Sequence, residues 1–377
     1  MHHPRIDVGI SVGTSPPLAA SNAFVRIGRL FGAESAWMVD HFTGFFPRSM
    51  WTPEFTWMAR GSSSADAFYD WQVYAGHFAT RLGRMRLGIG VTEPVRRHPV
   101  LLAQAALTLS HLTRHAPILG IGSGEAENIT PYGLNFDRPV SRLEEALQVI
   151  RLCFDADGPI DFEGTFYNLD GAVFDLKAGK AGTPRLWVAA HGPRMLRLTG
   201  RFADGWYPAL PMAPDDYARS LARVKASAVD WGRDPSAIVP SMQVFYLVGR
   251  NEADVERQVS HPAVRYLGLL APDYMWQARG LTHPFGEGFG GMTEIIPTAY
   301  SRAEVESAIE RVPASVVASN LIAGTPDQVV AALRELGEAG LRHAVLSPVS
   351  PIVSRRAAAY AFRTMPGIIR KLRSGEG

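Results

Sequence analysis

The sequence has a single cysteine, Cys153, among 377 residues, so no disulfide can form within the chain. An excess of charge of either sign is also missing, because 38 Lys and Arg residues stand against 36 Asp and Glu residues, without a basic run or tail. We therefore expect no nucleic acid as a partner. Cys153 lies in an amphipathic helical pattern, where we interpret it as a buried apolar residue, with a reactive thiol as the alternative.

Long apolar runs are absent as well. Charged residues, Gly or Pro interrupt each apolar stretch well before the roughly 18 residues that a membrane-spanning helix needs. The first ten residues, MHHPRIDVGI, lack the basic and then apolar pattern of a secretion signal. These features predict a cytoplasmic protein without stable membrane insertion.

Short β-branched runs alternate with longer helical patterns along the chain, which predicts βα units around a parallel sheet. Eight runs are candidate strands: 6–13, 36–41, 86–92, 116–125, 185–190, 204–209, 241–249 and 343–349. Helices are expected at 20–31, 69–81, 100–112, 142–154 and 325–341, and a β-hairpin at 160–174. Eight strands in series favour a closed α/β (β/α)8 TIM barrel over an open doubly wound sheet or several domains.

We expect a single domain over residues 1–377, with insertions after strands two, four and seven. The insertion after strand seven, at about 261–313, is rich in Gly, Pro and aromatic residues and has no clear periodicity. A loop of this length usually has a function, such as that of a lid, or forms part of a contact surface.

The carboxyl ends of the strands hold the active site in an α/β barrel. Strand two ends in Asp40 and His41, and an imidazole beside a carboxylate can donate or take a proton near neutral pH. The alternative is a histidine that merely bonds to a loop carbonyl. Glu125 follows strand four at the rim, and its alternative role is that of a charge at a helix N-terminus.

Small residues end strands three and four. Gly90 leaves room for a ring against the backbone, or for close packing of the strands. In the turn GIGSGE, glycines let the backbone approach a planar ligand. We therefore predict that Gly122, Ser123 and Gly124 contact a cofactor.

The stretch WVAAHGPRML, residues 187–196, reads as a strand, a turn and the start of a helix. The free amide groups at a helix N-terminus bind anions, and Arg194 could reinforce such a site. We predict a phosphate at this turn, with a plain strand-to-helix turn as the alternative. The pattern is neither the dinucleotide G-x-G-x-x-G motif nor a P-loop.

Five stretches together resemble the luciferase-like monooxygenase superfamily, and in particular its branch that depends on the deazaflavin coenzyme F420. The stretches are DH (40–41), GVTEPVRRHPVLLAQAALTL (90–109), LGIGSGEAENITPYG (119–133), WVAAHGPRMLRLTGRFADGW (187–206) and GTPDQVVAALRELGEAG (324–340). The resemblance runs over most of the chain, from the first strand to the last.

The resemblance implies roles for particular residues. It makes His41 the proton donor beside the cofactor, with Asp40 as the family's preceding Asp and Glu125 as its acidic residue after strand four. It also implies a non-prolyl cis peptide at Gly90–Val91 behind the deazaflavin, and a contact between Asn128 and the cofactor's tail. The turn that binds the cofactor's phosphate would consist of Ala189, Ala190, His191 and Gly192.

One position departs from the family pattern. Related dehydrogenases of this branch have a Trp four residues after the strand-two His, and this chain has Phe45. The surrounding loop, 42–58, is dense in aromatic residues and Met, which suits an apolar substrate, or packing as a lid or dimer surface. We expect Phe45, Trp51 and Trp57 to contact substrate. This loop and the 261–313 insertion are predicted to meet over the barrel mouth and form an elongated apolar cleft.

These residues and the resemblance predict an F420-dependent oxidoreductase that transfers a hydride from the reduced deazaflavin to the carbonyl of an apolar or lipid ketone. The developing alkoxide would be protonated by His41, or by Glu125 as a second choice. Two alternatives stay open: an FMN-dependent monooxygenase on the same barrel, and a carrier that binds a flavin or deazaflavin without turnover. The family resemblance implies a homodimer, and no metal site is expected.

Overall fold

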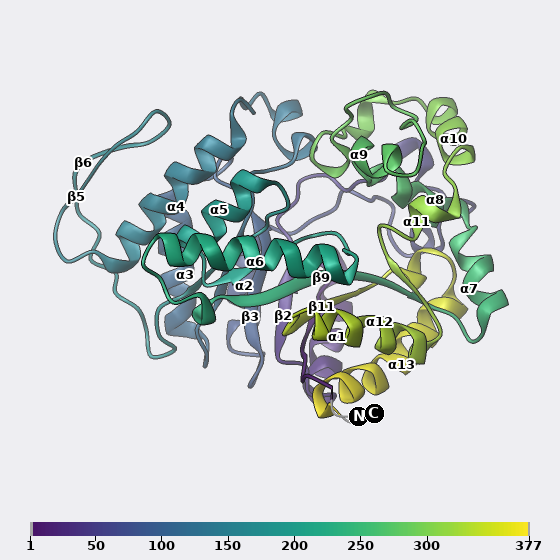
Figure 1. The fold of residues 1–377 in the computed structure, drawn as a ribbon, viewed down its shortest axis with the longest axis horizontal. Helices are drawn as coiled ribbons and strands as arrows, with labels where there is room; N and C mark the ends of the chain where they lie inside the picture. Colours follow the sequence, from purple (N-terminus) through teal and green to yellow (C-terminus); the bar gives the residue numbers. More distant parts are fainter. Residues whose placement is uncertain (1–2, 376–377) are drawn as a thin grey trace.

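Eight parallel strands close into a barrel in the computed structural model, which describes residues 3–375 (Figure 1). The strands are β1 (Asp7–Ser11), β2 (Ser35–Met38), β3 (Arg86–Thr92), β4 (Ile118–Ile121), β7 (Arg185–Val188), β8 (Gly205–Trp206), β9 (Val239–Val248) and β11 (His343–Pro348). Their order is β9-β11-β1-β2-β3-β4-β7-β8, and the pairing of β8 with β9 closes the ring. The predicted TIM barrel is confirmed.

Helices surround the barrel. The longer ones are α1 (Leu18–Leu30), α2 (Trp71–Ala79), α3 (Pro99–Leu112), α4 (Pro139–Asp155), α5 (Pro193–Phe202), α6 (Pro214–Asp230), α12 (Pro326–Glu338) and α13 (Arg355–Ser374). Their apolar faces pack on the sheet and bury Cys153 of α4, and this burial raises the pKa of its thiol to about 11. Cys153 is therefore a packing residue, because a reactive cysteine needs a lowered pKa. None of the helices within residues 3–375 is long and apolar enough to cross a membrane.

Large aromatic side chains fill the inside of the barrel because neighbouring strands carry glycine. The ring of Trp37 on β2 stacks on Tyr207 at 4.7 Å and lies 5.1 Å from the ring of Trp187 on β7. A Cβ at Gly88 would lie 2.5 Å from the Trp37 ring, and one at Gly205 would lie 2.5 Å from Trp187. The interior is thus solid, and binding chemistry is left to the barrel's ends.

The predicted hairpin is present as β5 (Ile160–Glu163) and β6 (Asn168–Ala172), which pair antiparallel and project from one side of the barrel (Figure 1). The carboxylate of Glu145 on α4 accepts hydrogen bonds from three backbone amides of the turn, 165–167. The hairpin is therefore anchored to the helix layer.

The segment between β9 and β11 differs from the prediction. It is not an irregular loop, since it forms five short helices and an additional strand, β10 (Ile322–Gly324), which pairs with the last residues of β9 and precedes α12. The helices are α7 (Glu252–Val259), α8 (Pro262–Tyr266), α9 (Asp273–Gln277), α10 (Arg302–Glu310) and α11 (Ala314–Val317). Helices of four to nine residues complete too few turns to show a periodic pattern, which explains the error. The inserted structure is also wider than 261–313.

The aromatic loop and the insertion lie against each other, as predicted. Phe46 and Tyr266 have ring centroids 5.0 Å apart, and the Tyr266 hydroxyl donates a hydrogen bond to the Phe45 carbonyl. Both segments contribute to one hydrophobic cluster, separate from the main barrel core. Trp276 and Phe289, two aromatic residues of the insertion, lie inside that cluster with exposed fractions of 1% and 6%, so they do not line the predicted cleft. The cleft itself stays a prediction.

Candidate active site

The polar residues predicted at the strand ends gather at one mouth of the barrel. The strands β2, β3, β4 and β7 are successive neighbours and all pair in parallel, so their carboxyl ends share one side. After β2 the chain supplies His41, and after β4 the short 3-10 helix η3 (Ala126–Asn128) follows Glu125. These two segments form the centre of the site.

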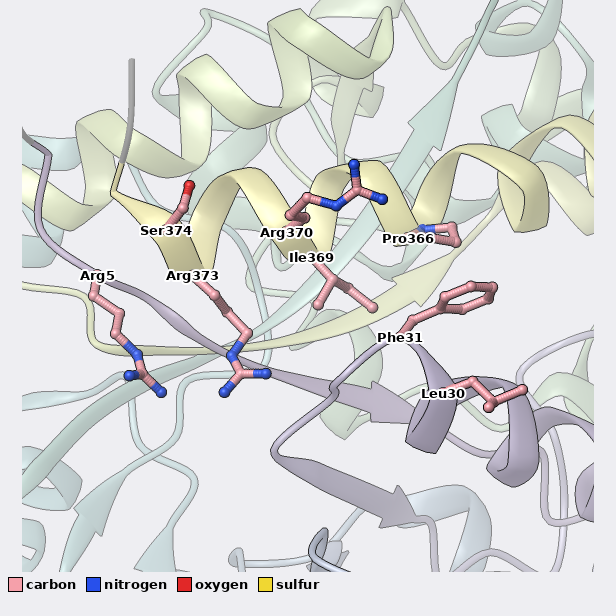
Figure 2. A pocket seen from close by; sticks show the side chains of 8 residues that line it. All are labelled: Arg5, Leu30, Phe31, Pro366, Ile369, Arg370, Arg373 and Ser374. Atoms are coloured by element: carbon pink, nitrogen blue, oxygen red, sulfur yellow. The ribbon is translucent and has the colours of Figure 1, made fainter.

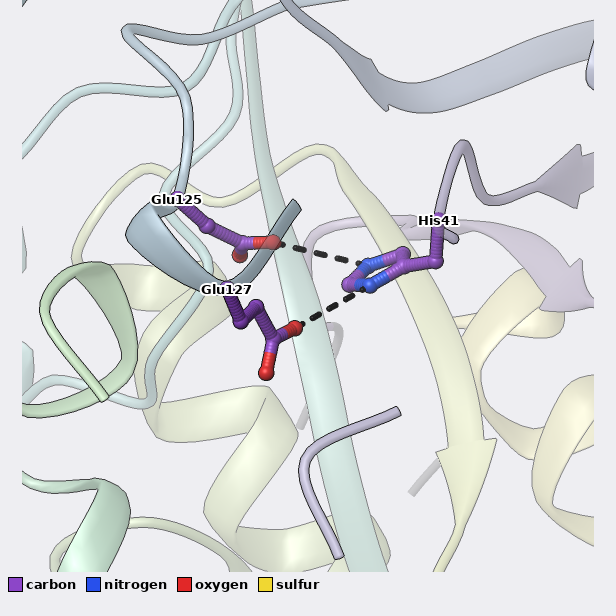
Figure 3. Close-up of side chains that lie close together, drawn as sticks. All are labelled: His41, Glu125 and Glu127. Atoms are coloured by element: carbon purple, nitrogen blue, oxygen red, sulfur yellow. Dashed lines mark ion pairs between the residues drawn. The ribbon is translucent and has the colours of Figure 1, made fainter. Parts of the chain in front are cut away.

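His41 lies between two carboxylates (Figure 3). Its Nε2 is 3.6 Å from Oε2 of Glu125, and its Nδ1 is 3.4 Å from Oε1 of Glu127. The side chains of His41 and Glu125 keep exposed fractions of 13% and 26%, whereas that of Glu127 keeps 1%. Glu125 therefore stands on the accessible side of the ring, and Glu127 stands behind it.

Asn128 joins the segment after β2 to the turn after β4. Its side-chain oxygen accepts hydrogen bonds from the backbone amides of Phe42 and Thr43, at 2.7 and 3.1 Å. The amide nitrogen of Asn128 then points its donors toward Glu125 and Glu127, at 3.3 and 3.2 Å. The predicted contact with the cofactor's tail would compete with these bonds and is not tested by them.

The same bonds determine the tautomer of His41. The ring's Nδ1 lies 3.1 Å from the Thr43 carbonyl, which can only accept a hydrogen bond. Nδ1 also lies 3.1 Å from the amide nitrogen of Asn128, but that group donates to the two carboxylates. We therefore assign a proton to Nδ1, which leaves Nε2, on the Glu125 side, to gain or lose one.

The pKa values of the cluster are strongly coupled. Burial lowers the pKa of His41, but the charges of Glu125 and Glu127 outweigh it and raise the pKa to about 9. Burial raises the pKa of Glu127 to about 7, against the hydrogen bond with His41, which lowers it. The pKa of Glu125 is also raised by burial, despite the nearby charge of His41. At neutral pH the ring is thus an imidazolium that can give up a proton.

Asp40 precedes His41 in the chain, and its carboxylate is held by neighbouring side chains. Its carboxylate pairs with Arg97 at 2.8 Å and Arg96 at 3.1 Å, and it accepts a hydrogen bond from the Thr92 hydroxyl at 2.7 Å. Arg96 also pairs with the buried Glu93 and lies over the Phe42 ring at 4.7 Å. The Asp40 carboxylate thus already has three partners within the protein. Its predicted contact with the cofactor stays a prediction.

The backbone after β3 and β4 has the expected small residues. The peptide Gly90–Val91 is cis, as the resemblance implies. A Cβ at Gly122 would lie 3.2 Å from the Val91 side chain, and Gly124 has a φ of +100°, which favours glycine. Ser123 stands between them. A Cβ at Gly90 would lie 2.9 Å from the Trp37 ring and 3.0 Å from the Tyr207 hydroxyl, so this glycine allows close packing inside the barrel.

The turn after β7 begins with Ala189 and Ala190 and leads into α5. Gly192 is the N-cap of this helix, and its first turn contains no acidic side chain. His191 accepts a hydrogen bond at Nε2 from the backbone amide of Ala209, at 3.0 Å. Arg194 binds Glu144 and Ser141 of α4 instead of adding charge freely to the turn.

The three predicted substrate residues occupy different places. The Phe45 ring lies 5.4 Å from the His41 ring, at the position where related dehydrogenases have a Trp. Trp51 packs against Phe46 and donates a hydrogen bond to the Ser62 carbonyl. Trp57 is half-buried at the start of a 3-10 helix, η2 (Trp57–Arg60). Of the three, Phe45 is the one with a contact to His41.

His41, Glu125 and Glu127 each have a donor atom within 4.8 Å of the others, a spacing that a cation could bridge. A metal ion binds one nitrogen of an imidazole ring at a time, whereas these carboxylates flank different ring nitrogens. An imidazolium, with a proton on each nitrogen, fits them better. We therefore interpret the cluster as a proton-transfer site.

A separate groove of about 420 Å³ lies at the other end of the barrel, between α1 and α13 (Figure 2). Arg5, just before β1, and Arg373 line it, and both guanidinium groups pair with Glu34. Arg5 also pairs with Asp7, so both guanidinium groups have carboxylate partners within the protein. The groove is remote from His41 because it opens at the amino ends of the strands.

The family of luciferase-like monooxygenases has a model that matches residues 7–343. The chain belongs to this family. The phthiodiolone/phenolphthiodiolone dimycocerosates ketoreductase of Mycobacterium tuberculosis is 39% identical over 350 residues, or 91% of this chain and 92% of the relative. The 5,10-methylenetetrahydromethanopterin reductase of Archaeoglobus fulgidus is 23% identical, over 87% of this chain and 89% of the relative.

Solved structures share the fold of this luciferase-like chain. An F420-dependent secondary alcohol dehydrogenase in complex with an F420-acetone adduct matches with a TM-score of 0.76 and 20% identity, over 98% of this chain and 99% of that one. The coenzyme F420 dependent tetrahydromethanopterin reductase from Methanopyrus kandleri matches with a TM-score of 0.73 and 20% identity, over 96% and 98%. At these identities the match concerns the barrel.

Several residues of this luciferase-like site were missed at the sequence level. Glu127 is the most important, and the repeated Glu in GEAEN was its one visible signal. Arg96 and Arg97, which hold Asp40, stand in a run that is typical of a solvated surface. Phe68, whose ring lies 5.5 Å from that of His41, and Tyr266 come from loops without periodicity.

Proposed function

We propose that this chain is an F420-dependent ketoreductase that converts an apolar or lipid ketone to an alcohol. The observation that carries the proposal is the partly buried cluster of His41, Glu125 and Glu127 at the barrel mouth. The named ketoreductase at 39% identity supports the reaction, and the F420-dependent proteins with the same fold support the cofactor.

The strand ends fit a flat cofactor with a phosphate tail. Glycine at position 122 keeps the surface beside Val91 flat, because a Cβ there would crowd that side chain. At Gly192 a Cβ would meet no atom within 4 Å, and the amide groups of the first turn of α5 can bind a phosphate. We assign the ring to Gly90, Val91 and residues 122–124, and the phosphate to 189–192.

When bound, reduced F420 supplies a hydride to the carbonyl carbon of the ketone. The negative charge that develops on the carbonyl oxygen needs a proton from a group about 3 Å away. His41 holds that proton at Nε2, and its charge stabilises the alkoxide before transfer. Glu125, on the same side of the ring, orients Nε2 and is the second candidate donor. Asp40 and Asn128 keep these groups in place through the bonds described above.

The preference for F420 over FMN can be tested by fluorescence titration of the purified protein. We expect a Kd for F420 at least about tenfold below that for FMN, a difference of about 1.4 kcal/mol. Gly192→Asp should weaken cofactor binding, because its carboxylate would occupy the amide groups and repel a phosphate. Gly192→Ala is the matched control, since its Cβ enters open space.

Equal or tighter binding of FMN would favour the FMN-dependent monooxygenase instead. If F420 binds but a panel of ketones gives no turnover, the chain is a carrier. Cofactor titration and a turnover assay on the same purified protein thus distinguish both alternative functions from the proposed one.

We also propose a homodimer in the cytoplasm. Val73 on α2 and Leu101 and Leu112 on α3 are exposed although apolar, and the two helices pack against each other. Exposed apolar side chains on adjacent helices suit an association surface. Light scattering should give twice the chain mass of 41.1 kDa, and a mass of one chain would contradict the dimer. The cytoplasmic location rests on the single, buried and free Cys153.

A further inference from the structure

Glu127 is the least exposed ionisable group beside His41. Its side chain keeps an exposed fraction of 1%, and its Oε2 is buried without a hydrogen-bond partner among the described residues. A buried polar atom without a partner is costly, so it indicates a role beyond packing. The other oxygen, Oε1, faces Nδ1 of His41 at 3.4 Å.

We propose that Glu127 is a positioning residue, which holds the proton on Nδ1 of His41 and keeps the ring charged so that Nε2 carries the transferable proton. This inference rests on the proposed ketoreductase function. The physical logic is that of a carboxylate behind a catalytic imidazole, which sets the tautomer and stabilises the imidazolium without touching substrate.

The two carboxylates have different roles because they lie on opposite sides of the His41 ring. Glu125 faces Nε2 and keeps an exposed fraction of 26%, so it stands on the side that substrate can reach. Glu127 faces the opposite nitrogen and is nine-tenths buried or more, so it can act only through His41. The amide of Asn128 donates to both and fixes their spacing.

Other charged groups around Glu127 set the pH range of its effect. The charges of Glu125 and of Asp66, which follows the aromatic loop in the chain, raise its pKa. In the insertion, burial and then the charge of Glu127 raise the pKa of the Tyr266 phenol. On the far side of the cluster, Arg96 and Glu93 act on Glu125 with opposite signs. Glu127 loses its proton near pH 7 and His41 near pH 9, so the carboxylate supports the imidazolium chiefly between these values. Each of these two pKa values depends on the charge of the other group.

The test is an NMR titration of the full-length protein with ¹³C-labelled histidine, without cofactor or substrate. Among the 11 histidines, His41 is identified by the signal that is lost in His41→Gln. We expect Glu127→Gln to lower the midpoint of His41 by at least about one pH unit, or tenfold in proton affinity. Glu127→Asp should restore most of it. Asp66→Asn is the comparison variant and should shift the midpoint much less, since Asp66 acts on Glu127 but has no contact with His41.

An unchanged midpoint in Glu127→Gln would overturn the proposal. If that variant does not fold, the wild-type protein can still overturn the proposal, because ¹⁵N shifts that place the proton of the neutral ring on Nε2 at high pH would contradict it. Because the titration needs no turnover, it remains readable if the ketoreductase function is wrong. With an active enzyme, the alkaline limit of the reduction of methyl octyl ketone should move by the same amount as the midpoint.

Discussion

Replacing His41 with alanine is expected to lower kcat for ketone reduction about 10²- to 10⁴-fold, the usual contribution of a general acid, while the Kd for F420 stays nearly unchanged. The reason is that proton transfer acts in the transition state and contributes little to binding of the cofactor in the ground state. Stopped-flow measurement of F420 oxidation by a ketone, together with cofactor titration, separates the two effects.

The role of His41 as proton donor also predicts how the rate of reduction changes with pH. His41 must be protonated to donate, and its pKa is raised to about 9, so reduction should be fast at neutral pH and fall as the pH rises through that value. Alcohol oxidation needs the neutral ring and should show the opposite trend. His115→Ala, a half-buried histidine before β4 at the other end of the barrel, is the control. A full rate in His41→Ala would move the donor role to Glu125.

The barrel could be predicted from the sequence because short apolar runs alternate with helical patterns along the chain. The strand β8 has only two residues, and the aromatic run 204–209 around it indicated its place. Each of the eight predicted runs overlaps one barrel strand. The extra strand β10 has three residues and the helices of the insertion have at most nine, so neither repeats its pattern often enough to be recognised. What such segments become is decided by their packing with distant residues.

The site residues that follow the strand ends could be predicted from the sequence. His41 and Glu125 lie within four residues of the ends of β2 and β4, and the parallel order β2-β3-β4 brings them to the same end of the barrel. Glu127 was missed because it lies in the three-residue 3-10 helix η3, which is too short for the sequence to show which way its side chains point. The bond from Tyr266 to Phe45 joins residues 221 positions apart, and no local pattern records it. Contacts of this kind need the folded chain.

Ketones with longer apolar chains are expected to be better substrates. Phe45 and Phe68 flank His41, and Phe46 joins Tyr266 of the insertion, so the surroundings of the proton donor are aromatic. Burial of each methylene contributes about 0.8 kcal/mol, so three additional carbons should raise kcat/KM roughly fiftyfold, until the chain leaves the predicted cleft. Steady-state rates for a series of methyl ketones measure this slope.

Two variants at Phe45 test whether the dependence of kcat/KM on chain length comes from the aromatic residues beside His41. Phe45→Leu keeps an apolar side chain beside His41 and should retain most of the chain-length dependence, whereas Phe45→Asn should flatten it. The backbone carbonyl of Phe45 still accepts the Tyr266 hydroxyl in both, so the loop keeps its anchor to the insertion. A flat or falling series in the wild-type protein, or a clear preference for sugar phosphates, would leave the aromatic loop as packing between barrel, insertion and partner subunit.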